Sequence, residues 1–110
     1  MKDLKISKEL ASEVLGVSII KYTMRENDII YFTKSPTFKD VDIPSKLINI
    51  YEFAFKCKEW AYQNNYDMWS ITWGAVEFQN NIKSKGTERI DADTEVEAII
   101  EACTWILKEI

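Results

Sequence analysis

Apolar residues recur at helical spacing near the C-terminus of the chain. Thr94 and Glu97 form a capping box there, and acidic Glu95 also favours the start of a helix. The apolar face that follows consists of Val96, Ile99, Ile100, Cys103, Ile106, Leu107 and Ile110. This spacing predicts an amphipathic final helix that packs on a sheet.

A second helix is predicted over residues 47–65. Its apolar stripe consists of Leu47, Ile50, Tyr51, Ala54, Cys57 and Ala61, widened by Phe53 and Trp60. Either Ser45 or Asn49 can cap this helix, and Asn49 followed by Glu52 has the spacing of a capping box. The asparagines at 64 and 65 are typical of a helix end.

The N-terminal part of the chain predicts a short helix followed by a β-hairpin. Ser7 caps about two helical turns, which end at Gly16. Two β-rich runs follow, over residues 17–23 and 29–33, and the polar residues between them suit a turn. Residues 34–45 hold both prolines and show no periodicity, which predicts a loop or an irregular edge strand.

Alternation in the C-terminal half predicts a strand. Trp69, Ile71 and Trp73 recur at every second position, and Gly74 then interrupts the pattern before Val76 resumes it with a shifted phase. A bulge or bend at the glycine explains the shift. The polar stretch 79–91 predicts a loop, or a loop around one short strand.

The elements therefore run helix, strand, strand, helix, broken strand, helix. This order is typical of an α+β fold built as a layered α/β sandwich. We expect one antiparallel or mixed sheet of about three to five strands, packed by two long helices and a short N-terminal helix. The length of 110 residues and the 46% hydrophobic content suit one domain over residues 1–110.

Charge and cysteine content narrow the class of protein. The formal net charge of −4 argues against nucleic acid as a partner. The longest uncharged stretch, residues 68–76, is far too short to cross a bilayer, so no membrane partner is expected. Cys57 and Cys103 each fall within an apolar helical stripe, which favours buried thiols over a disulfide and indicates the cytoplasm.

Most catalytic machinery is missing from the sequence. The chain has no histidine, which removes the usual general base and the usual neutral metal ligand. Its three glycines are isolated, so no phosphate-binding loop is present and no cofactor is expected. Lys56 and Lys58 flank Cys57 but point to other sides of a helix, so a structural thiol is favoured over a nucleophile.

Three carboxylates are the strongest candidates for chemistry. Asp91, Asp93 and Glu95 alternate just before the final helix, a spacing that recurs in magnesium and calcium loops. The alternative, which we favour, is that they serve the helix N-terminus, because the glycine of a calcium loop is absent.

Trp69 and Trp73 are the candidate partner-binding residues. On one strand they would share a sheet face. Under a packed helix they would belong to the core, which we favour, whereas on an uncovered face they would form an aromatic patch that binds protein.

Several stretches, most of them in the C-terminal half, match the sequence pattern of a known protein family. They are Trp73-Gly74-Ala75-Val76-Glu77-Phe78, the pair Asp93-Thr94, and Ala98-Ile99-Ile100-Glu101-Ala102, with Leu10 to Gly16 similar in placement. In these stretches the chain resembles the phage ABA-sandwich proteins, small phage and prophage proteins of unknown function. The strand region after Gly16 departs from that pattern, being longer and more hairpin-like. The resemblance implies an αβα layered domain of phage or prophage origin and supplies no catalytic residue.

Three functional hypotheses follow. The first is a small cytoplasmic, phage- or prophage-derived accessory protein that binds another protein and is not an enzyme. The second is a divalent-cation-dependent hydrolase or ligand-binding domain that uses Asp91, Asp93 and Glu95. The third rests on analogy of fold alone and is a small acidic protein like a secretion chaperone, which would be a homodimer.

Overall fold

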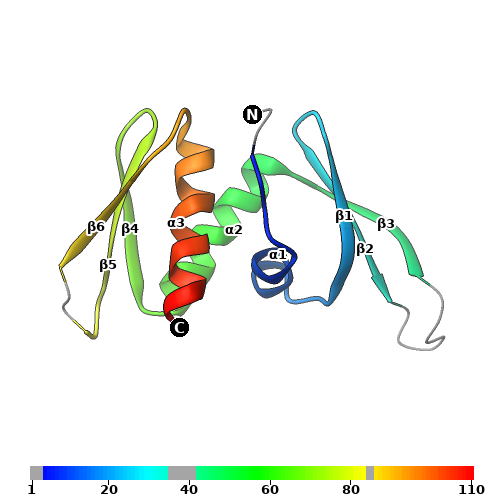
Figure 1. Cartoon of the computed structure of the whole chain (residues 1–110), viewed down its shortest axis with the longest axis horizontal. Coiled ribbons are helices and arrows are strands. Elements are labelled where there is room, and N and C mark those ends of the chain that lie inside the picture. The colour runs from blue at the N-terminus through cyan, green and yellow to red at the C-terminus, as the bar shows by residue number, and fades with distance from the viewer. Residues whose placement is uncertain (1–3, 35–41, 84–85) are drawn as a thin grey trace.

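The helices lie between two separate antiparallel sheets (Figure 1). The computed structural model describes residues 4–34, 42–83 and 86–110. The first sheet contains β1 (Ile19–Arg25), β2 (Asp28–Lys34) and β3 (Asp42–Asn49), and the second contains β4 (Tyr66–Thr72), β5 (Ala75–Asn80) and β6 (Thr87–Asp91). The helices are α1 (Lys8–Leu15), α2 (Ile50–Gln63) and α3 (Glu95–Glu109). The described residues span 46 × 30 × 17 Å.

The α+β class predicted from the sequence is confirmed, but the single sheet is wrong. Helix α2 begins directly after β3 and carries the chain away from the first sheet. With a rise of about 1.5 Å per residue, its 14 residues cover about 21 Å. The strands that follow therefore pair only with each other, and the layer order is sheet, helices, sheet rather than helices around one sheet.

The predicted N-terminal hairpin is confirmed, with the first strand shifted by two residues, a longer second strand and a tighter turn. Arg25 pairs with Asp28, so only Glu26 and Asn27 form the turn, and Glu26 adopts a positive φ of 56°. The backbone N–H of Ile50 donates to the carbonyl of Asn27 at 2.7 Å, which joins the start of α2 to this turn.

The region before α2 is an edge strand, one of the two alternatives predicted for residues 34–45, but it extends to Asn49, where the sequence predicted a helix from residue 47. Strand β3 contains Pro44 and pairs only with β2, so it is the edge strand where proline is tolerated. Asn49 caps α2, since its Oδ1 accepts from the N–H of Tyr51 at 2.8 Å. The prediction that Leu47 lies in the helix is wrong, because the cap is two residues further on. Residues 35–41 of the predicted segment lie outside the described residues.

The other two helix caps match the sequence prediction. Ser7 Oγ accepts from the N–H of Leu10 at 3.0 Å, and Gly16 ends α1 in the left-handed region with a φ of 69°. Thr94 Oγ1 accepts from the N–H of Glu97 at 3.2 Å. Local sequence therefore fixes where α1 and α3 begin.

The β4–β5 hairpin differs in detail from the prediction. Thr72 pairs with Ala75, which leaves Trp73 and Gly74 as a two-residue turn, and the irregularity in the ladder lies between Ser70 and Thr72 rather than at the glycine. The polar stretch predicted over residues 79–91 contains β6 as its one short strand.

Gly74 is required where it stands because a second segment contacts its backbone. The N–H of Ala92 donates to the carbonyl of Gly74 at 2.7 Å. A Cβ atom built on Gly74 would lie 2.2 Å from the carbonyl oxygen of Ala92, far inside van der Waals contact. The tip of the hairpin is thereby attached to the segment that leads into α3.

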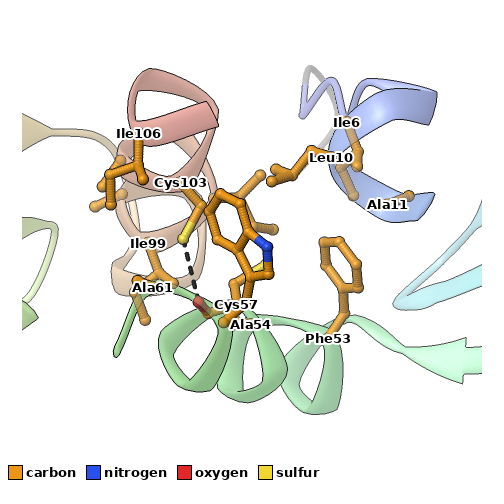
Figure 2. Packing of buried hydrophobic residues seen from close by; sticks show 14 of the residues in the cluster. Ile6, Leu10, Ala11, Phe53, Ala54, Cys57, Ala61, Ile99, Cys103 and Ile106 are labelled. Atoms are coloured by element: carbon orange, nitrogen blue, oxygen red, sulfur yellow. Dashed lines mark hydrogen bonds between the residues drawn. The ribbon is translucent and has the colours of Figure 1, made fainter. Parts of the chain in front are cut away.

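A continuous cluster of buried residues joins the three helices and the inner faces of both sheets. Figure 2 shows Leu10 of α1, Phe53 and Cys57 of α2 and Cys103 of α3 pointing into the space between the helices. Toward the second sheet the cluster ends in an aromatic group, in which the rings of Phe78 and Trp105 lie edge to face with centroids 5.2 Å apart.

We predict that Gly74→Ala lowers the free energy of unfolding by about 1–3 kcal/mol, because the added methyl group forces the hairpin and residue 92 apart. Urea denaturation measures this change. The neighbouring substitution Trp73→Ala is the control and changes stability by less than about 0.5 kcal/mol, since its side chain is exposed. Equal stability of Gly74→Ala and the unmodified protein would show that this close approach is not maintained in solution.

Candidate functional site

Both candidate tryptophans lie outside the core. Trp73 is in the β4–β5 turn and is 83% exposed. Trp69 is 39% exposed and points away from the helices, because the adjacent Met68 pairs with buried Phe78 on the inner face. The core interpretation favoured from the sequence is therefore wrong. Its physical reason is that the helices cover only the inner face of the second sheet.

The two tryptophans also do not share one strand face, since Trp73 belongs to the turn. On the outer face, Trp69 has Glu77 as its cross-strand neighbour, and Glu77 in turn pairs with Arg89. A charged row thus borders one side of Trp69, while on the other side no described strand pairs with β4.

A further apolar surface lies on α2, where three aromatic side chains point into solvent. Tyr51, Phe55 and Tyr62 are 55%, 64% and 70% exposed. Their spacing of four and seven residues places them along one line of the helix, which we call the α2 aromatic face. The opposite side of α2 faces α1 and α3, as Figure 2 shows for Phe53 and Cys57.

Charged residues of both signs flank the α2 aromatic face. Glu52 and Glu59 are exposed and lie on one edge of the line, two helical turns apart, with half-buried Lys56 between them. Half-buried Lys58 lies between Phe55 and Tyr62. Beyond the edge with Glu52 and Glu59 is a shallow groove between α1 and α2. Its lining residues are Val14, Lys56, Glu59, Trp60 and Gln63. The surface therefore combines an aromatic line, an edge with charges of both signs and a mostly polar groove.

The sequence pattern does not predict this surface. It assigns Tyr51 to the buried stripe of the helix, whereas the side chain is 55% exposed. Phe55 and Tyr62 lie outside the stripe altogether, and two large aromatic residues seven positions apart on the polar side of an amphipathic helix were the available signal.

The three candidate metal-binding carboxylates do not form a site. Asp91 ends β6 and forms an ion pair with Arg89, with 3.0 Å between Nη2 and Oδ1. Glu95 begins α3, and Asp93 precedes its cap as an exposed residue. Within residues 4–34, 42–83 and 86–110, no group of three acidic, cysteine or histidine side chains is arranged to hold a metal ion.

Cys57 and Cys103 are both free and buried, as the sequence predicts. The Cys103 thiol donates to the backbone carbonyl of Cys57 with a sulfur–oxygen distance of 3.4 Å, drawn as a dashed line in Figure 2. A hydrogen bond with the Cys103 thiol, and then burial, raise the pKa of Cys57 far above its ordinary value. A thiol held in its protonated form in a closed core is a poor nucleophile.

The raised pKa of Cys57 predicts a loss of stability in alkali. The unfolded chain releases the Cys57 thiol proton near pH 8.5, whereas the folded protein retains it. The stability that the protonated thiol contributes to the folded state is therefore complete below that pH and is lost as the pH rises above it. We expect the free energy of unfolding to fall by up to about 1.4 kcal/mol per pH unit from about pH 9. Denaturant titrations across this range measure the slope of the free energy of unfolding against pH. An unchanged slope in Cys57→Ala would contradict the attribution of this loss to Cys57.

Comparisons with known proteins found no similar protein: no protein-family model, curated protein or solved structure matches the chain. No helix among the described residues is long and apolar enough to cross a membrane. The exposed apolar surfaces of α2 and β4 are therefore the features on which a function can be argued.

Proposed function

We propose that this chain is a small accessory protein, without catalytic activity, that acts by binding another protein through the α2 aromatic face. The observation that carries this proposal is the line of three aromatic side chains, each more than half exposed, on one side of α2. Contiguous apolar surface of this kind is characteristic of interaction sites. Tyrosine in particular supplies much of the binding energy at interfaces, because it buries a large ring and keeps a polar end.

The occupant we propose is an amphipathic helix of the partner that carries charges of both signs beside its apolar stripe. The spacing of Tyr51, Phe55 and Tyr62 suits a second helix laid along α2. Basic residues on that helix would lie against Glu52 and Glu59, and an acidic residue would lie against Lys58.

The groove beside α2 offers polar contacts to such a partner. Lys56, Glu59 and Gln63 line it together with Val14 and Trp60, and Glu59 stands both at the groove and at the edge of the α2 aromatic face. A polar partner side chain in the groove would thus lie next to Glu59 and Lys56.

The proposal includes a cytoplasmic location and a phage or prophage origin. A cytoplasmic location is supported by two free, buried thiols. The phage or prophage origin rests on the resemblance of residues 73–78 and 93–102 to the ABA-sandwich proteins. A role without catalysis is supported by the lack of histidine and by the protonated, enclosed state of Cys57.

The test is Phe55→Glu, which places a charge at the centre of the α2 aromatic face. Affinity capture from native lysate followed by mass spectrometry identifies the partner, and calorimetry with the purified partner measures the affinity. We expect at least a tenfold loss of affinity with an unchanged melting temperature, because Phe55 is exposed in the free protein. Ile82→Glu is the matched control, since Ile82 is also exposed but lies after β5 rather than on α2, and it should bind like the unmodified protein.

Two outcomes would contradict the proposal. One is equal binding by Phe55→Glu and Ile82→Glu. The other is turnover of a phosphoester, ester or nucleotide that disappears when a single carboxylate is changed to alanine.

The cation-dependent alternative has its own prediction. Because Asp91 is paired with Arg89 and the other two carboxylates do not converge with it, millimolar Mg²⁺, Ca²⁺ or Mn²⁺ should leave the melting temperature unchanged. A cation bound to the native state would raise it by mass action. A rise that is lost in Asp91→Asn or Asp93→Asn would restore the metal-site hypothesis.

A further inference from the structure

Four strands form the edges of the two sheets, and three of them carry features that discourage pairing with another chain. Strand β1 carries Lys21 and Arg25, and Lys8 Nζ donates to the carbonyl of Ile20 at 3.2 Å. Strand β3 contains Pro44 and Lys46. Strand β6 is highly charged through Glu88, Arg89 and Asp91. Charges and proline at sheet edges are the usual protection against edge-to-edge association.

Strand β4 lacks this protection over most of its length. From Met68 to Thr72 it has neither charge nor proline. Four consecutive residues, 69–72, are exposed. In the described part of the chain, no hydrogen bond joins the outer edge of β4 to another element. Its unpaired backbone groups are therefore available to a further strand.

We infer that β4 pairs antiparallel with β4 of a second copy, about a two-fold axis near Trp69. This pairing would join the two second sheets into one continuous sheet and remove both free edges. A two-fold axis perpendicular to a sheet places each strand residue opposite a residue of the same face, so the contact is self-complementary.

The residues of β4 favour a second copy as the occupant. With Trp69 at the axis, the two Trp69 rings form a cross-strand aromatic pair on the outer face. Asp67, the only charged residue of β4, then lies opposite Ile71 of the second copy, so no like charges meet. Trp73 lies near Asn65 of the second copy, which would cover a ring that is 83% exposed in the single chain.

The expected affinity is moderate. With the axis at Trp69, the paired stretch is about five residues of each strand, 67–71, and the irregularity between Ser70 and Thr72 limits the ladder beyond it. Such a contact covers less area than a standard interface, and we expect a dissociation constant in the micromolar range. None of these residues belongs to the α2 aromatic face, so the inference is independent of the proposed function.

Light scattering coupled to size exclusion, over about 5–500 µM protein, tests this inference. The expected mass rises with concentration from the monomer value of 12.9 kDa towards twice that value. Ser70→Lys introduces a charge at an exposed position of the free edge and should raise the dissociation constant at least tenfold. Thr87→Lys, the same kind of change at an exposed position of the β6 edge, and Phe55→Glu on α2 should both leave it unchanged.

A second measurement examines the position of the axis. Trp69→Cys should form a covalent dimer under mild oxidation, because the two Cβ atoms face each other across the axis, whereas Thr87→Cys should not. The inference is overturned by a monomer at 500 µM, by a dimer that Ser70→Lys does not weaken, or by a dimer that Phe55→Glu abolishes. Loss of dimerisation with intact partner binding would contradict the dimer but not the proposed function. Loss of partner binding with intact dimerisation would contradict the proposed function but not the dimer.

Discussion

Helix α2 is the constraint on which the rest of this structure depends. It starts one residue after β3 and is followed closely by β4, so it fixes the distance between the two sheets. Its buried side supplies Ile50, Phe53 and Cys57 to the core, and α1 and α3 both pack against that side. Because a helix has only one stripe that these neighbours can cover, the remaining face of α2 stays in water.

The order of elements also repeats. A helix followed by three antiparallel strands occurs from α1 to β3 and again from α2 to β6, and α3 closes the chain. In both units a two-residue turn joins the first two strands. The helices of the two units and α3 share one interior layer, so within the described residues the helices cover each sheet on one face only. This arrangement leaves far more open sheet surface than helices around a single sheet would.

Local signals in the sequence were sufficient for much of the fold. The caps at Ser7 and Thr94 and the N-terminal hairpin depend on residues a few positions apart, and the structure confirms them. The number of sheets could not be predicted in this way, because strand pairing is decided by contacts distant in the sequence. Trp69 and Trp73 show the same limit, since alternation describes a strand without saying which face a helix covers or where a turn begins. Tyr51 was misplaced because burial at the border of a helical stripe depends on neighbours from other elements.

The attachment of the β4–β5 turn to residue 92 has a consequence for recognition. Trp73 sits beside a glycine whose carbonyl is held by the segment leading into α3, so the backbone that presents the indole ring is anchored at both ends of the turn and at its tip. A side chain displayed on such a fixed support loses little main-chain freedom when a second surface closes over it. Less of the contact energy is then spent on ordering the loop, and a small area of contact becomes enough for association.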